Sequence, residues 1–444
     1  MTSLPFVRSL VWSVAALLAL SACDNLASLG DRGFRSPREQ YIGNLKSAAL
    51  HETALGRDWI VAGDVALARA TVVTAPHREA IHIPASEPRA VAWRLPLRRG
   101  DRLIISAQVA MEPLGRLFVD LFTVPRDTTE TFERVASAPE SGTSIDVEIR
   151  RDGEYVVRAQ PELLRGGRIV LTITTGPTLA FPVAGRDARI ARSLFGAPRD
   201  AGRRAHHGVD LFAPRGTPVV AATPGIVRRV GQTELGGNVV WLLDPRREQS
   251  LYYAHLDKHL VSTGDVVQVG DTLGLVGNTG NARGTPPHLH FGVYRRGQGP
   301  VDPLPFIDTR RGEPAEIAVD TSFLGQRVRI ARAQGTLRSA PGTNGSGRSV
   351  PRTAVLVVRG AAGNALRVEL PSGEIGFVVA SAVQRADVPV TVVTREAGAV
   401  LRERPVPSAV IVDSLARRAR LSVLGRYGRW LLVEREGREG WIAD

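Results

Sequence analysis

The chain is poor in several residue types, and each shortage excludes a class of protein. It has one cysteine, Cys23, so it forms neither an internal disulfide framework nor a zinc cluster built from cysteines. Only two of its 57 basic residues are lysines, Lys46 and Lys258, so its cationic character comes from arginine. No apolar run approaches the ~20 residues that a membrane-spanning helix needs. We therefore expect a protein without a transmembrane segment.

What remains is the composition of an ordinary globular protein. The 444 residues suggest three or four domains at ~100–200 residues each. The shares of hydrophobic residues (43%) and charged residues (23%) argue against a mainly disordered or fibrous chain. The 45 glycines and 29 prolines, together with few aromatic residues, favour many short strands and turns over long helices. The sequence therefore predicts a mainly β, multidomain protein.

The first 23 residues have the features of an export signal. Arg8 precedes an uncharged, largely apolar run, Ser9 to Ala22, which is too short to cross a ~30 Å hydrocarbon core. The residues Leu20-Ser21-Ala22-Cys23 resemble the lipobox of bacterial lipoproteins, in which cleavage precedes the cysteine and the thiol carries a diacylglycerol. The resemblance implies a signal peptide at 1–22 and a lipid on Cys23, which would anchor the protein on the periplasmic side of the inner or outer membrane. The alternative is a plain secretory signal with an incidental cysteine.

The pattern of strand and turn residues divides the rest of the chain. Residues 23–57 predict a tether followed by one short helix within Arg38 to Leu55. Residues 58–179 contain short alternating or apolar runs broken by Gly, Pro and Asp, which favour a β-sandwich. Residues 180–310 have strand patterns dense with glycine, which favour an antiparallel β domain. The runs that carry the sandwich prediction are Arg102–Val109, Leu117–Val124, Ile145–Ile149, Tyr155–Ala159 and Ile169–Ile173.

An internal repeat at an offset of 64 residues marks the C-terminal part. Two short motifs recur at this offset, Leu337-Arg338 as Leu401-Arg402 and Gly376-Phe377-Val378 as Gly440-Trp441-Ile442. Both copies resemble bacterial SH3-like domains, which open on Leu-Arg before a proline-containing loop and end on a strand with Gly, an aromatic and an aliphatic residue. The resemblance implies two small barrels, at 325–386 and 388–444.

The positive charge is concentrated in these two repeats. Residues 325–444 carry 19 arginines against 10 acidic residues, which accounts for +9 of the formal net charge of +13. The excess indicates attraction to a polyanion, such as a cell-wall polymer or anionic lipid headgroups. A solvated arginine surface without a partner explains the same composition. After export, nucleic acid is the less plausible partner.

Six of the nine histidines lie within residues 206–290. His206 and Asp210 are four residues apart, so on an extended chain they point to one face. His288 and His290 are separated by one residue and also share a face, ~7 Å apart. His255 follows Tyr252 and Tyr253 in a third segment. Of the other two, His259 is expected at the surface, and His207 is expected either to face solvent or to lie just behind the ligands.

Two imidazoles and a carboxylate suit a catalytic zinc ion. Such an ion takes three protein ligands and keeps a fourth position open for water. Bound water then ionises near pH 7, and the ion polarises a carbonyl group. Two further histidines beside that water can orient or deprotonate it and stabilise the developing oxyanion. The spacing alone does not assign which histidine has which role.

The order of motifs from His206 to Phe306 resembles the lysostaphin-type (LytM-like) zinc endopeptidases of peptidoglycan. The matching passages include His206-His207-Gly208-Val209-Asp210-Leu211, Tyr253-Ala254-His255-Leu256 and His288-Leu289-His290-Phe291. Position by position, the resemblance implies that His206, Asp210 and His290 bind Zn²⁺. It makes His255 and His288 the catalytic pair around the water and the tetrahedral intermediate. The match covers about 110 of the 444 residues, with several motifs in the right order.

These observations predict a lipid-anchored zinc endopeptidase that hydrolyses peptide cross-links of peptidoglycan. Tyr252, Tyr253 and Phe291 are candidates to line its groove, although we expect them to pack in the core. One alternative is a non-catalytic scaffold or activator of another wall hydrolase that retains the metal for stability. Another is an adhesion lipoprotein that binds the wall without needing zinc.

Overall fold

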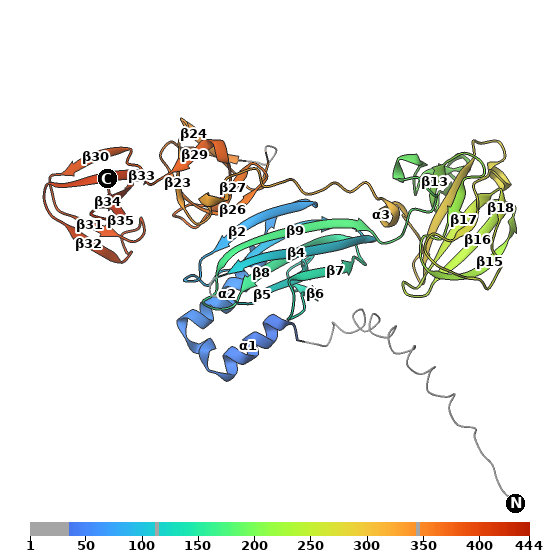
Figure 1. Ribbon diagram of the computed structural model, residues 1–444, viewed down its shortest axis with the longest axis horizontal. Helices are drawn as coiled ribbons and strands as arrows, with labels where there is room; N and C mark the ends of the chain where they lie inside the picture. Colours follow the sequence, from blue (N-terminus) through green and yellow to red (C-terminus); the bar gives the residue numbers. More distant parts are fainter. Residues whose placement is uncertain (1–34, 112–114, 343–346) are drawn as a thin grey trace, which may run out of the picture.

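The computed structural model describes residues 35–111, 115–342 and 347–444, so Cys23 and the expected signal peptide lie outside the described residues. The described chain is mainly β, as the composition predicts. Figure 1 shows a β-sandwich between two other parts, with a second unit (179–307) at one end and the third (321–385) and fourth (391–443) units at the other. Among the helices described, none is long and apolar enough to cross a membrane.

Two helices precede the sandwich, where the sequence predicts one. They are α1 (Pro37–Ser47) and α2 (Ala54–Ala68), with a 3-10 turn at Leu50–Glu52 between them. α1 begins at a capping box in which the Ser36 hydroxyl accepts from Glu39 N. α2 contains two glycines, which weaken a helix pattern in sequence. Gly63 leaves room for the Arg38 side chain, since a Cβ at this position would lie 2.1 Å from the Arg38 guanidinium.

Nine strands form the two sheets of the sandwich. One sheet has the order β1-β3-β8-β5-β6, and the other contains β2-β9-β4-β7. The five strand runs expected from the sequence are confirmed as β4, β5, β7, β8 and β9. The bounds are β1 (Thr71–Val72), β2 (His77–Ile83), β3 (Val91–Leu97), β4 (Asp101–Met111), β5 (Leu117–Thr123), β6 (Glu133–Ser137), β7 (Ser144–Glu148), β8 (Gly153–Pro161) and β9 (Gly167–Pro177).

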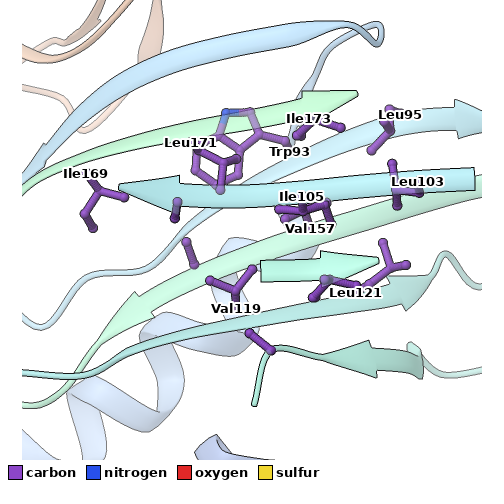
Figure 2. Packing of buried hydrophobic residues seen from close by; sticks show 14 of the residues in the cluster. Trp93, Leu95, Leu103, Ile105, Val119, Leu121, Val157, Ile169, Leu171 and Ile173 are labelled. Atoms are coloured by element: carbon purple, nitrogen blue, oxygen red, sulfur yellow. The ribbon is translucent and has the colours of Figure 1, made fainter. Parts of the chain in front are cut away.

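Alternation along the strands directs apolar side chains between these sheets. On β4, Leu103 and Ile105 are fully buried, whereas Ile104 between them is exposed. Figure 2 shows Ile105 near Trp93 of β3 and Ile173 of β9, and Leu103 near Leu95 of β3. The sandwich therefore has its own hydrophobic core.

The second unit is built on an eight-stranded antiparallel sheet, β10-β13-β21-β17-β16-β15-β19, with β22 beside β21. A three-stranded sheet, β14-β20-β18, packs with it around a second core. The bounds are β10 (Ala191–Ser193), β11 (Pro198–Arg199), β12 (Arg204–Ala205), β13 (Val209–Phe212), β14 (Pro218–Val220), β15 (Gly225–Thr233), β16 (Gly237–Asp244), β17 (Gln249–Leu256), β18 (Lys258–His259), β19 (Val266–Val267), β20 (Thr272–Leu275), β21 (His288–Arg295), β22 (Gly299–Val301) and α3 (Leu304–Ile307).

The 64-residue repeat has a structural counterpart in the third and fourth units. Arg338 pairs with Phe377 in one unit, and Arg402 pairs with Trp441 at the same place in the other. The strands are β23 (Arg327–Ile330), β24 (Gln334–Arg338), β25 (Gly347–Pro351), β26 (Val355–Ala362), β27 (Ala365–Glu369), β28 (Ile375–Val379), β29 (Val383–Arg385), β30 (Thr391–Arg395), β31 (Ala399–Arg402), β32 (Ile411–Leu415), β33 (Ala419–Tyr427), β34 (Trp430–Arg435) and β35 (Arg438–Ala443).

The glycine of each repeated triplet also has the same function in both units. A Cβ on Gly376 would lie 2.7 Å from Leu337, and a Cβ on Gly440 would lie 2.5 Å from Leu401. The glycine therefore makes room for the leucine of the Leu-Arg motif. This explains why the two motifs recur together at one offset.

The third unit is not separate from the sandwich. β26 pairs with β2 through Ala80↔Ala361 and Ile81↔Gly360, which joins them into one eleven-stranded sheet. The segment 308–320 connects the second unit to the third, and an ion pair of 2.7 Å between Arg311 and Asp101 fixes it to the sandwich. Sequence patterns do not predict this continuous sheet, because the two strands lie on opposite sides of the second unit in the chain.

A buried ion pair holds this junction together. The Arg367 guanidinium of β27 binds both oxygens of Glu79 on β2, at 2.6 and 2.8 Å, and Trp93 Nε1 donates to the same carboxylate at 2.7 Å. Glu79 is fully buried. Burial raises the pKa of Glu79, but the Arg367 charge and hydrogen bonds outweigh this effect and hold the pKa well below its usual range.

We expect Glu79→Gln to destabilise the junction by about 3–5 kcal/mol, because Arg367 then stays buried without a counter-charge. The depressed pKa gives the wild type a contribution that is complete above the unfolded-state pKa of ~4.3 and is lost as pH falls. The difference in the free energy of unfolding between the wild type and Glu79→Gln therefore becomes smaller from pH 5 to pH 3. Calorimetric melting of both proteins over this range measures it. A difference that stays constant over this pH range would contradict the depressed pKa of Glu79.

Candidate metal centre

Three side chains converge on one point of the second unit. His206 Nε2 lies 2.9 Å from His290 Nδ1 and 3.0 Å from Asp210 Oδ1, and the last two atoms are 3.1 Å apart. His206 and Asp210 are buried, and His290 is partly buried. Two ring nitrogens and a carboxylate oxygen thus form a triangle with sides near 3 Å.

Strand pairing brings these residues together. Asp210 on β13 lies directly opposite His290 on β21, so both side chains point to the same face of the sheet. Gly208 precedes β13, and a Cβ there would lie 2.7 Å from His290 Nε2. The glycine of the His-His-Gly-Val-Asp motif therefore leaves room for the His290 ring.

The triangle has the chemistry of a metal site. His206 Nδ1 lies 2.9 Å from the Leu194 carbonyl oxygen, which only accepts, so the neutral ring holds its proton there and directs the Nε2 lone pair at the other two atoms. In a tetrahedron with bonds of ~2.0–2.1 Å, ligand atoms are roughly 3.3 Å apart. The observed spacing is close to this value, so the donor set fits a small divalent ion such as Zn²⁺.

The directions of the pKa shifts of Asp210 and His290 agree with this chemistry. Burial would raise the pKa of Asp210, but hydrogen bonds with His206 and His290 and the charge of these rings hold it well below its usual range. Burial lowers the pKa of His290, against the opposing effect of Asp210. An ionised carboxylate and a neutral imidazole are the forms that bind a metal.

His255 reaches this face through a local break in β17. Ala254 lies opposite His290, so simple alternation would direct His255 into the core. The pairing with β16 shifts register here, and His255 has φ 62°, in the left-handed region that favours glycine. As a result its ring lies 5.0 Å from the His288 ring and 5.9 Å from the His290 ring, between ring centroids.

His255 and His288 are held in the same way. Each Nδ1 lies 2.9 Å from a backbone carbonyl oxygen, of Thr279 for His255 and of Pro286 for His288. In the neutral rings Nδ1 is therefore the donor, and Nε2 is the proton acceptor. His288 Nε2 lies 4.0 Å from Asp210 Oδ1. Burial, and then the neighbouring His288, lower the pKa of His255 to about 4, so the ring is neutral near pH 7.

The structure thus brings together all five residues that the resemblance singles out. His207 is exposed, and His259 is partly buried with Nε2 3.1 Å from the Gly231 carbonyl oxygen. Tyr253 and Phe291 pack in the core and are fully buried, as expected. Tyr252 differs, because it lies on the same face as His290 with a ring-centroid distance of 5.7 Å.

Sequence reasoning missed one residue of the site. Arg199 Nη2 donates to Asp210 Oδ2 at 2.6 Å, so Asp210 has one oxygen on an arginine and the other on the histidines. The same nitrogen lies 2.6 Å from Ser193 Oγ on β10. In the sequence Arg199 is one arginine among 55, in a segment with no motif of its own.

Comparison with known proteins identifies the unit that carries this site. Residues 204–303 match the model of Peptidase family M23, which includes all five residues described above. The chain therefore contains a Peptidase M23 domain. The match leaves the sandwich and the third and fourth units outside it.

Similar proteins each match a part of the chain. An L-Ala--D-Glu endopeptidase of Bacillus subtilis is 35% identical over 29% of this chain and 42% of its own length. The peptidoglycan DD-endopeptidase ShyC of Vibrio cholerae is 41% identical over 20% of each. Among solved structures, the catalytic domain of lysostaphin from Staphylococcus simulans is 33% identical, covering 26% of this chain and 87% of that chain with a TM-score of 0.23. The chain thus spans less than half the length of these two curated relatives.

We expect Arg199→Met to weaken Zn²⁺ binding by roughly 10–100-fold, because residues that orient a ligand affect metal affinity by that much. Without the guanidinium, Asp210 is free to turn. Competition with a chromophoric chelator at pH 7.5 measures the dissociation constant. Arg186→Met, which removes an exposed arginine of the same unit, is the control. Tighter binding in the Arg199 variant would mean that the positive charge repels the ion more than it orders the carboxylate.

Proposed function

We propose that this protein, through its Peptidase M23 domain, is a zinc endopeptidase that hydrolyses peptide cross-links of bacterial peptidoglycan. One observation carries the proposal. His206, Asp210 and His290 meet in a triangle that fits Zn²⁺, and two more histidines stand beside it with Nε2 as acceptor. The names of the B. subtilis and V. cholerae relatives support peptidoglycan as the substrate.

The proposed chemistry divides between the ion and the histidines. When bound, Zn²⁺ supplies a Lewis acid for the scissile carbonyl and for the attacking water. His255 and His288 can each accept a proton at Nε2, because the carbonyl oxygens of Thr279 and Pro286 hold the other nitrogen. Once protonated, either ring becomes a donor that stabilises the developing charge on the substrate oxygen or passes the proton to the leaving amine.

The left-handed backbone of His255 fits a catalytic role. Non-glycine residues at such φ values cost ~1–3 kcal/mol and cluster at functional sites. Regular strand geometry would have buried the His255 ring in the core. The left-handed backbone instead directs the ring toward the metal triangle.

The other parts of the chain fit an enzyme of the cell envelope. We propose that Cys23 carries the lipid anchor, on the basis of the Leu20-Ser21-Ala22-Cys23 run. We also propose that the third and fourth units are SH3-like domains that bind the wall through their arginine excess and so raise the local substrate concentration. The sandwich then acts as a spacer between binding and cleavage.

The test is digestion of purified peptidoglycan, with soluble muropeptides identified by mass spectrometry. We expect His255→Ala to lower the rate at least ~100-fold, the range of acid–base contributions. His290→Ala should also lose bound zinc, measured by atomic absorption. His207→Ala, which removes an exposed histidine beside His206, should leave the rate unchanged. A folded, zinc-loaded wild type without cleavage would favour the scaffold alternative.

A further inference from the structure

The two carbonyl oxygens that hold His255 and His288 belong to one loop. Thr279 and Pro286 both lie in residues 277–287, between β20 and β21, which we call the β20–β21 loop. The histidines themselves lie on two different strands, β17 and β21. In a neutral imidazole, the partner of one nitrogen decides which nitrogen carries the proton. The tautomer of both rings therefore depends on the shape of this one loop.

The Thr279 end of the loop is fixed to the main sheet by the threonine hydroxyl. Thr279 Oγ1 donates to the Leu256 carbonyl oxygen at 2.8 Å and accepts from Asn238 N at 2.9 Å. Gly237 permits this close approach, since a Cβ at that position would lie 2.2 Å from Thr279 Oγ1. Leu256 directly follows His255 in β17. The hydroxyl thus ties the Thr279 backbone to the strand that carries His255.

The Pro286 end of the loop is held by a different side chain, that of Asn278. Asn278 Nδ2 donates to the carbonyl oxygens of Arg283 and Thr285, at 3.3 and 3.2 Å. The amide therefore closes the loop between its beginning and the residue before Pro286. Pro287 follows Pro286 and restricts it to extended conformations. The position of the Pro286 carbonyl oxygen is thus set by the contacts of Asn278.

Arg215 determines which way the Asn278 amide faces. Its guanidinium, in the segment after β13, donates to Asn278 Oδ1 with one nitrogen and to Asp257 Oδ1 with another. A guanidinium only donates, so it binds the amide oxygen and leaves Nδ2 facing the loop carbonyls. The side chains of Arg215 and Asp257 are 49% and 37% exposed, so their ion pair contributes little to stability. The contact therefore orders the amide more than it stabilises the fold.

We propose that Asn278, oriented by Arg215, is the positioning residue for His288, and that Thr279 is the positioning residue for His255. This inference rests on the proposed function, because it assigns what holds the two proposed proton acceptors. Each side chain acts through a backbone carbonyl group and not by touching the substrate. The two are independent, since the hydroxyl and the amide bind different parts of the chain. Removal of either one should therefore change one ring and leave the other as it was, which general loosening of the domain would not do.

The first test reads the tautomer of each ring from 15N chemical shifts of the histidine-labelled, zinc-loaded full chain at pH 8. In the wild type, His255 and His288 should both carry the proton on Nδ1. Asn278→Asp keeps an oxygen for the arginine but replaces the donor by a second acceptor, so it should shift His288 toward the Nε2-protonated form and leave His255 unchanged. Thr279→Val should do the reverse. Asn281→Ala, which removes an exposed asparagine side chain of the same loop, is the matched control and should change neither ring.

The second test is the rate of cleavage of a soluble cross-linked muropeptide dimer. Asn278→Asp should lower kcat roughly 10–100-fold with KM little changed, because misplacing a catalytic group costs up to about 100-fold. Arg215→Met should lower kcat about tenfold, the effect of one charged hydrogen bond. Thr279→Val should lower kcat as Asn278→Asp does, whereas Thr279→Ser, which keeps the hydroxyl, should retain the wild-type rate.

The outcomes separate this inference from the proposed function. If the zinc-loaded wild type cleaves no peptidoglycan dimer while the two tautomers respond as described, the proposed function fails and the two holding contacts stand. If the wild type cleaves, and Asn278→Asp and Thr279→Val each change both rings or neither, the assignment of one positioning residue to each histidine is overturned. An Asn278→Asp variant that raises KM and leaves kcat unchanged would overturn it as well, because the loop would then serve binding.

Discussion

The candidate site depends on one cross-strand pair, Asp210 on β13 opposite His290 on β21. This pair sets two corners of the metal triangle on one face of a sheet whose other face is the core. The carboxylate is constrained at both oxygens, by the histidines on one side and by Arg199 on the other. Everything else in the site is arranged around this fixed carboxylate. His206 closes the triangle from the segment just before β13, and a register shift in β17 turns His255 toward it.

Much of the site was predictable because its residues lie in short motifs with a strand period. His288 and His290 share a face by simple alternation, and the order of motifs assigned their roles by resemblance. Arg199 could not be found in this way, because its contact with Asp210 depends on where the strand pair β11 and β12 lies relative to the sheet. Tyr252 was expected in the core beside Tyr253, but adjacent residues of a strand face opposite sides, and only Tyr253 is buried. The register of strand pairing decides which of two adjacent residues faces the core, and this register cannot be inferred from a single sequence.

The fold was predictable to a similar extent. Strand runs, glycine-rich turns and the 64-residue repeat predicted a mainly β chain. α2 was missed because Gly56 and Gly63 interrupt its pattern, although close contacts with Leu50 and Arg38 explain both glycines. The eleven-stranded sheet was missed for a different reason. Its joining contacts, β2 with β26 and Glu79 with Arg367, connect segments that flank the whole second unit. No local pattern in either segment identifies the other.

That sheet also has a consequence for how the chain matures. Because β26 follows the second unit in the sequence, β2 emerges during synthesis long before its partner does. Until then its free backbone groups form an open edge, the kind of surface on which β proteins aggregate. Pairing between such distant segments is also slow. A nascent chain that pauses at this stage is therefore exposed to wrong pairings, until the third unit is made and its strands complete a sheet whose first strand lies near the start of the chain.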